Sequence, residues 1–155
     1  SGITYSKKEA RITIKKVPDQ PGIAAKIFLP ISDAGILVDM IIQNTTDGNL
    51  TDMTFTVSRK ELKQTLEMME EVAKKTGARE VLHDVSVAKV SAIGVGMRNH
   101  SGVAARAFAA LTQEGINILM ISTSEIKITI LIQEKYVELA VRILHDTFGL
   151  DWDLG

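Results

Sequence analysis

The sequence predicts an α+β protein built from two copies of one small unit. The first observation is an ungapped internal repeat, because residues 21–41 match residues 101–121. The second is the alternation of apolar and polar residues, which predicts strands with one buried face. The third is the helical period of the apolar residues between those strands. Together they predict two consecutive βαββα units, the first followed by a further strand.

The first unit is expected to run strand–helix–strand–strand–helix–strand. Its strands are predicted at residues 10–17, 36–44, 51–57 and 79–84, and its helices at residues 23–34 and 58–77. The segment 36–44 is strongly apolar and is expected to be a central strand. Pro30 predicts a kink in the first helix, or its end near Leu29. Ser58 and Glu61 predict a capping box at the start of the second helix.

The second unit repeats this order but lacks an obvious last strand. Its strands are predicted at residues 85–95, 116–122 and 125–132, and its helices at residues 102–114 and 134–148. The remaining residues 150–155 are short and acidic. We therefore expect residues 2–5 to supply the missing edge strand, so that the two units interleave. The predicted domains are residues 6–84 and residues 85–155, the second completed by a strand from residues 1–5.

The composition excludes several classes of function. The net charge is −1, with 18 basic and 19 acidic residues, so there is no broad positive surface for nucleic acid. The absence of cysteine excludes disulfides, thiolate catalysis and cysteine metal sites. No apolar run reaches about 18 residues and no signal-peptide pattern is present, which predicts a cytoplasmic protein without a membrane span. The first residue is not methionine, which suits a fragment of a longer protein.

No residue pattern predicts catalysis or a cofactor. There is no nucleophile–base pair and no glycine-rich phosphate loop with its lysine. His83, His100 and His145 lack the spacing of metal ligands, so no metal site is expected. The Gly-Val-Gly sequence of residues 94–96 follows a predicted strand, as in a dinucleotide-binding fingerprint. The next glycine, Gly102, comes too late for that motif.

The most specific local feature is the turn at residues 17–25, where a strand ends and a helix begins. Free N–H groups at a helix N-terminus bind carboxylates and phosphates, and Gly22 allows a ligand to approach the backbone. Asp19 beside these groups is placed to hold an ammonium group, so the turn suits a free amino acid. A purely structural interpretation remains open: Asp19 orders the turn, while Gly22 and Ala25 permit close packing of the helix on the sheet.

The second copy predicts a related but unequal site. Its turn spans residues 96–103, and Asn99 stands where the first copy has Asp19, so an amide replaces the carboxylate. Polar residues also end the strands beside both turns, at residues 43–44 and 122–125. These are either ligand contacts or ordinary turn residues, and the sequence leaves both interpretations open.

These residues resemble a known family. The repeated βαββαβ pattern, with Asp-Gln-Pro-Gly-Ile-Ala-Ala at residues 19–25, resembles the ACT domain, a ferredoxin-like module that senses amino acids. Residues 38–44, 51–57, 89–91 and 121–128 resemble the tandem ACT region of bacterial aspartokinases, and the likeness extends over nearly the whole chain. It implies two ferredoxin-like units with antiparallel sheets and helices on one face, side by side in a dimer.

In that family this region regulates a kinase that phosphorylates aspartate with ATP, and no such kinase half occurs here. The resemblance implies a non-catalytic module without a cofactor, partnered with an aspartokinase catalytic domain or subunit. It would bind threonine, lysine or both where ACT units of two chains meet. The implied effector contacts are Asp19, Gly22, Ile23, Ala24, Gln43, Asn117 and Ile118 for threonine, and Met97, His100, Gly102, Val103, Ser124 and Glu125 for lysine. The loop 45–50 is shorter than in some relatives, which leaves the choice of amino acid open.

Two other functions remain open from the sequence. A stand-alone ACT protein would sense amino acids for transcription or for another enzyme, and an upstream kinase reading frame in the gene would distinguish it from an aspartokinase. A catalytic ferredoxin-like enzyme is the weaker alternative, because no acid–base pair or cofactor motif is present.

Overall fold

The computed structural model describes residues 2–94 and 102–154 of the chain. The chain forms two compact units. The first unit comprises Lys8–Val85, and the second comprises Ser1–Lys7 together with Ser86–Gly155. The N-terminal segment therefore belongs to the same unit as the C-terminal half.

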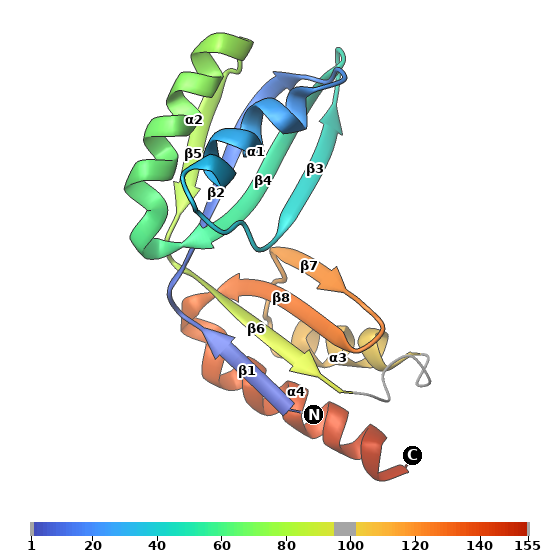
Figure 1. Ribbon diagram of the computed structural model, residues 1–155. Coiled ribbons are helices and arrows are strands. Elements are labelled where there is room, and N and C mark those ends of the chain that lie inside the picture. The colour runs from blue at the N-terminus through green and yellow to red at the C-terminus, as the bar shows by residue number, and fades with distance from the viewer. Residues whose placement is uncertain (1, 95–101, 155) are drawn as a thin grey trace. The chain divides into compact units, whose positions relative to one another are not determined.

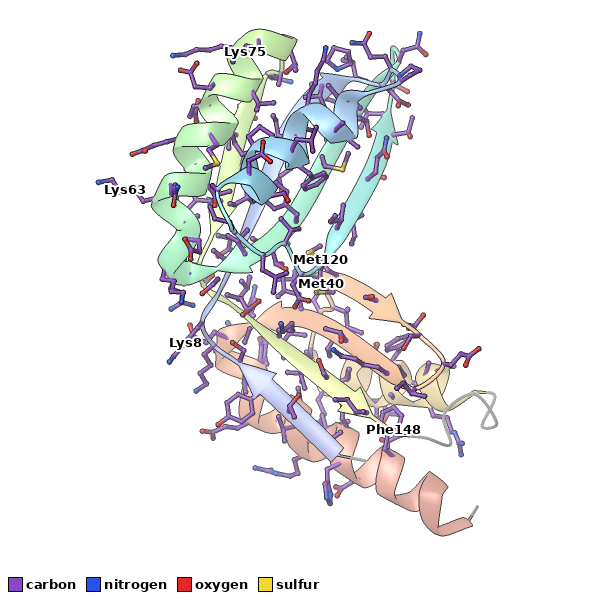
Figure 2. All side chains as sticks on the ribbon, viewed as in Figure 1. Lys8, Met40, Lys63, Lys75, Met120 and Phe148 are labelled. Carbon is purple, nitrogen blue, oxygen red and sulfur yellow. The ribbon has the colours of Figure 1, made fainter. Side chains whose placement is uncertain are left out.

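The first unit is an antiparallel sheet covered on one face by helices (Figure 1). The strand order is β3-β4-β2-β5, so β4 and β2 are central. The elements of this unit are β2 (Glu9–Pro18), α1 (Ile23–Asp33), β3 (Ile41–Thr46), β4 (Leu50–Ser58), the 3-10 helix η1 (Arg59–Glu61), α2 (Leu62–Thr76) and β5 (Glu80–Asp84). Lys63 and Lys75 extend from α2 away from the sheet (Figure 2).

The core of the first unit forms because the apolar positions of its central strands fall on one face. Ile12 and Ile14 of β2 lie opposite Phe55 and Met53 of β4, and these side chains are at most 1% exposed. The ring of Phe28 meets that of Phe55 edge to face, with 5.3 Å between centroids. The buried residues of α1, which follow the helical period, are Ile23, Ile27 and Ile31.

The second unit repeats this architecture with the N-terminal strand at one edge (Figure 1). Its strand order is β1-β6-β8-β7, and β1 pairs antiparallel with β6, with Ile3 opposite Ala92. The elements are β1 (Gly2–Ser6), β6 (Val87–Ile93), α3 (Val103–Gln113), β7 (Met120–Thr123), β8 (Lys127–Gln133), the 3-10 helix η3 (Glu134–Tyr136) and α4 (Val137–Leu154). Phe148 of α4, labelled in Figure 2, is 1% exposed in the core of this unit. None of the helices in the described residues combines the length and apolar character needed to cross a membrane.

Both sheets carry the same hydroxyl pair between their central strands. The hydroxyl oxygens of Thr13 and Thr54 are 2.9 Å apart in the first unit, and those of Ser91 and Thr129 are 3.0 Å apart in the second. Directly opposed hydroxyls of this kind stabilise a strand pair. The pairs also define equivalent positions in the two units.

The predicted α+β class, with antiparallel sheets and helices on one face, is confirmed in both units. The expectation of a central strand at residues 36–44 is wrong. β3 begins only at Ile41 and lies at the edge of the sheet. Ile36 and Met40 precede it and are 6% and 4% exposed. Their apolar character therefore reflects burial of the connection from α1, and not a place in the middle of the sheet.

Two expectations concerned helix ends. α1 continues through Pro30 to Asp33, so of the two effects expected of Pro30, an end near Leu29 does not occur. Pro30 removes one N–H from the helix, but the buried face of α1 still packs on the sheet. Because tertiary packing supplies most of the stability of a helix, α1 continues past the proline. Ser58 forms no side-chain cap, because the chain makes the 3-10 turn η1 before α2 begins.

Candidate functional site

The turn between β2 and α1 is held in place by main-chain hydrogen bonds. Asp19 donates its N–H to the carbonyl oxygen of Asn49 at 2.8 Å, which ties the turn to the β3–β4 loop. Ile23 donates its N–H to the carbonyl oxygen of Gln20 at 3.2 Å, and its side chain, 4% exposed, anchors the start of α1 in the core. Gly22 occupies the N-cap position with a φ of 90°, which favours glycine. The start of α1 therefore has a defined position relative to the sheet.

Gln43 of β3 reaches the same turn. Its Nε2 donates to Oδ1 of Asp19 at 3.5 Å, which joins residues that are distant in the sequence. Both side chains are exposed. Because a carboxylate has acceptor sites on both oxygens, Asp19 keeps the capacity to accept hydrogen bonds from an ammonium group.

The N-terminus of α1 supplies donors beside this carboxylate. Lys26 donates its N–H to the carbonyl oxygen of Gly22 at 3.1 Å, the first bond of the helix. Within the described residues, the N–H groups of Ala24 and Ala25 make no hydrogen bond, and both residues are exposed. Such groups, aided by the helix dipole, bind carboxylates. The turn thus offers donors for a carboxylate and an acceptor for an ammonium, the two charges of a free amino acid.

The start of α3 repeats the geometry of α1. Gly102 is the N-cap residue with a φ of 88°, and Arg106 donates its N–H to the carbonyl oxygen of Gly102 at 2.9 Å. Val103 is the first residue of α3, and only its backbone is described. The predicted contacts Met97 and His100 lie outside the described residues.

The other residues predicted in the second unit lie at the two ends of β7. Asn117 and Ile118 precede this strand, and Ser124 and Glu125 follow it in the turn to β8. Ser124 donates its N–H to the carbonyl oxygen of Lys127 at 2.8 Å, which closes that turn. Ile118 is partly buried against the core, and the other three predicted residues are exposed. Because β7 separates the two pairs, they do not form one group within the second unit.

One polar contact beside the first turn was not predicted from the sequence. The carboxylate of Asp52 in β4 accepts a hydrogen bond from the N–H of Lys16 in β2 at 2.9 Å. The sequence did contain a sign of this irregularity in β2, because Lys15 and Lys16 interrupt its alternation of apolar and polar residues. Such an interruption is typical of a β-bulge.

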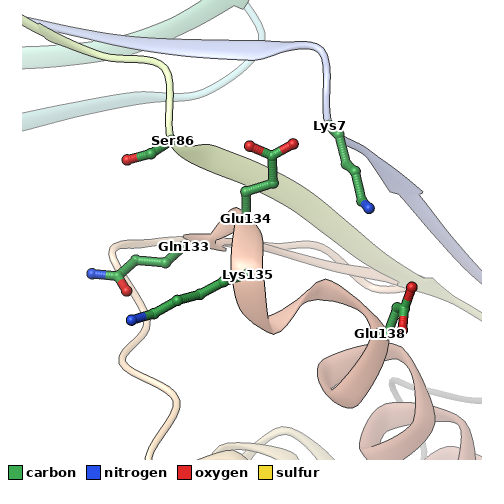
Figure 3. A pocket seen from close by; sticks show the side chains of 6 residues that line it. All are labelled: Lys7, Ser86, Gln133, Glu134, Lys135 and Glu138. Atoms are coloured by element: carbon green, nitrogen blue, oxygen red, sulfur yellow. The ribbon is translucent and has the colours of Figure 1, made fainter.

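A separate cleft of about 690 Å³ lies in the second unit, at the start of η3. It is lined by Lys7, Ser86, Gln133, Glu134, Lys135 and Glu138. These side chains point in several directions and do not converge on one point (Figure 3). Its lysines are balanced by its glutamates, so the cleft favours neither charge. No group of three or more His, Cys, Asp or Glu side chains in the described part of the chain is arranged to hold a metal ion.

Replacing Gly22 with alanine is expected to lower the free energy of unfolding by about 1–2 kcal/mol, because a positive φ is costly for a residue with a Cβ. No atom lies within 4 Å of a Cβ built at this position, so the cost comes from the backbone alone. Gly149→Ala, within α4 and equally uncrowded, is the matched control and is expected to add about 0.5–1 kcal/mol. Urea denaturation measures both changes in the free energy of unfolding. A Gly22→Ala variant that unfolds at the parent's urea midpoint would contradict the expected backbone strain.

Two family models match the chain, and both describe the ACT domain. One matches residues 10–74, which lie in the first unit, and the other matches residues 90–148, which lie in the second. The repeated fold and the repeated glycine-capped turn thus define a protein with tandem ACT domains.

The chain is also similar to solved regulatory subunits. It matches a crystal structure of aspartokinase alpha and beta subunits with 53% identity and a TM-score of 0.90, covering 96% of this chain and 98% of that one. It matches the ligand-free regulatory subunit of aspartate kinase from Thermus thermophilus with 39% identity and a TM-score of 0.89, covering 96% of this chain and 97% of that one. The chain therefore belongs to the family of aspartokinase regulatory subunits.

Longer relatives contain a region that is similar to this chain. It is 54% identical to the aspartate kinase of Stutzerimonas stutzeri over 100% of this chain and 38% of that protein. It is 56% identical to the aspartokinase of Pseudomonas aeruginosa over 97% of this chain and 37% of that protein. The chain thus spans less than two fifths of the length of these curated relatives.

Proposed function

We propose that this chain is the allosteric module through which threonine, lysine or both inhibit an aspartokinase. The observation that carries the proposal is the arrangement at the start of α1. There the Asp19 carboxylate, held by Gln43, lies in the same turn as the free N–H groups of Ala24 and Ala25. Membership of the aspartokinase regulatory family supports the same ligand class.

The chemistry of an amino acid suits this arrangement. Its carboxylate would accept hydrogen bonds from the N–H groups at the start of α1, and its ammonium would donate to Asp19. Gln43 orients the Asp19 carboxylate through its amide. In the proposed dimer, Asn117 and Ile118 of a second chain complete this threonine-type site.

The second copy of the turn is proposed to serve lysine. Gly102 and Val103 begin α3 as Gly22 and Ile23 begin α1. The proposed contacts of this second site are Met97, His100, Gly102, Val103, Ser124 and Glu125.

Regulation requires that the effector bind one state better than another. An amino acid that bridges two chains would stabilise one dimer geometry, and this bias would reach the catalytic domain or subunit that phosphorylates aspartate. Such coupling is typically worth about 1–3 kcal/mol per effector. Two unequal sites would allow one end product to modify the response to the other.

Titration calorimetry of the chain with each of the twenty amino acids tests this function. We expect saturable binding of L-threonine, L-lysine or both, and none of D-threonine, whose groups cannot meet the same partners. Sedimentation with and without the bound amino acid measures the dimer, and an added aspartokinase catalytic subunit reports inhibition. A chain that binds none of the twenty amino acids would contradict the proposal.

A further inference from the structure

The end of β2 contains a β-bulge. The register of β2 against β4 shifts between Ile14 and Val17. In that interval Lys15 and Lys16 together oppose the single residue Asp52 of β4, which is the residue count of a bulge. Lys16 has a φ of 59°, in the left-handed region that side-chain-bearing residues seldom occupy.

The bulge reverses which face the following residues occupy. Ile14 faces the helices, so uninterrupted alternation would bring Lys16 to that face and turn Val17 away from it. Instead Val17 is 0% exposed in the core beneath the helices. Asp19, two residues further along, follows Val17 to the same face.

The hydrogen bond between Gln43 and Asp19 requires both side chains on the helix side of the sheet. Gln43 pairs with Met53, a core residue of β4, and directly paired residues share a face of the sheet. The 3.5 Å bond from Gln43 Nε2 to Asp19 Oδ1 is therefore made on the helix side of the sheet. The hydrogen bond between Gln43 and Asp19 therefore depends on the bulge. So does the position of Asp19 beside the start of α1.

Asp52 stabilises the bulge from the other face. It is adjacent to Met53 in β4, so its side chain alternates to the face away from the helices. Its Oδ1 accepts the N–H of Lys16 at 2.9 Å, in a partly buried position. A bond from a backbone N–H to a carboxylate is charge-assisted, and it offsets the cost of the positive φ at Lys16.

The second unit differs at the position of Asp52. The register of β6 against β8 is continuous over Val87–Ile93, and residues 95–101 lie outside the described part of the chain. Thr54 and Thr129 hold equivalent positions in the hydroxyl pairs, and the residues two before them are Asp52 and Lys127. A lysine ammonium has no acceptor for a backbone N–H. The carboxylate that accepts the Lys16 N–H therefore occurs in the copy that carries Asp19, and Lys127 stands at the equivalent position of the other copy.

We propose that Asp52 is a positioning residue for the effector site, because its carboxylate holds the bulge that turns Asp19 toward Gln43 and the start of α1. Asp52 acts through the backbone of Lys16, from the face of the sheet opposite to Asp19. The effect on threonine affinity rests on the proposed function, whereas the effect on the turn does not.

The first test replaces Asp52 in the whole chain. In Asp52→Ala, the threonine dissociation constant is expected to rise about 3- to 10-fold, the effect of losing one partner of a partly buried hydrogen bond. In NMR spectra the amide resonance of Asp19 is expected to shift, and the N–H of Lys16 to exchange faster. Asp52→Asn keeps an oxygen acceptor and is expected to restore the Asp19 resonance and most of the affinity.

Two further variants separate positioning from a general loosening of the sheet. Thr54→Ala removes the hydroxyl pair from the same two strands but leaves the bulge, so it is expected to keep the parent affinity and Asp19 resonance. Adding Lys16→Gly to Asp52→Ala is expected to recover affinity, because glycine adopts a positive φ without a partner.

The positioning role is wrong if Asp52→Ala keeps the parent Asp19 resonance and Lys16 exchange rate. It is equally wrong if Thr54→Ala shifts them as much. Failure of the unmodified chain to bind any amino acid would contradict the proposed function instead. The resonance and exchange measurements would still decide the role of Asp52.

Discussion

Threonine binding is expected to weaken about 10- to 100-fold when Asp19 is replaced with alanine, because a hydrogen bond to a charged group is worth about 1.5–3 kcal/mol. In the proposed site, Asp19 is the acceptor for the ammonium of the effector, and its carboxylate accepts a hydrogen bond from Gln43. The alanine leaves the donors at the start of α1 intact. Calorimetric titration with threonine measures the change.

Two variants control for the loss of charge and of shape. Asp33→Ala removes an exposed carboxylate from the far end of α1, and is expected to change the affinity by less than about 2-fold, since exposed charges contribute little. Asp19→Asn copies the amide that stands at Asn99 in the repeat, and is expected to lose most of the affinity while keeping an acceptor for Gln43. If Asp19→Ala binds threonine as tightly as the parent chain, Asp19 is not the partner of the effector's ammonium group.

Replacing Phe55 with alanine is expected to lower the free energy of unfolding of the first unit by about 3–5 kcal/mol. Phe55 is 0% exposed in the middle of β4, where it contacts the helices and lies opposite Ile12 and Ile41 of its two neighbouring strands. Its removal leaves a cavity that rigid strands on both sides cannot close. Chemical denaturation followed by circular dichroism measures the loss.

Phe28→Ala is the matched control for Phe55→Ala. It removes the same ring from the other side of the edge-to-face pair, but from a partly buried position on α1. Its cost is therefore expected to be smaller, and a cost equal to that of Phe55→Ala would contradict the central role of β4 in the core. Phe148→Ala removes a ring from the core of the second unit. If the two units unfold independently, this variant lowers the stability of the second unit and leaves that of the first unchanged.

Local patterns in the sequence were enough to predict the repeat, the α+β class and most of the elements. Apolar periodicity identifies a strand or helix because it reports which side is buried. The turn containing Asp19 and Gly22 was found the same way, since a strand, a glycine and a helix follow one another without a gap. The α1 helix was predicted at residues 23–34 and extends over Ile23–Asp33.

Strand order could not be obtained from these patterns. The apolar segment 36–44 resembled a central strand, although β3 begins at Ile41 and lies at the sheet edge. Burial of Ile36 and Met40 in a connection produces the same composition as burial in a sheet. All the effector contacts stay predictions, and two of them, Met97 and His100, lie outside the described residues.

Composition and periodicity thus determined the repeated unit, its fold class and the turn that carries Asp19, because each depends on residues adjacent in the chain. Tertiary structure alone decided the edge position of β3 and the face on which Asp19 meets Gln43. The bulge at Lys16 and the carboxylate of Asp52 set that face, and they lie on different strands. Pairing between distant strands fixes register to a single residue, and one residue changes the face of every side chain beyond it.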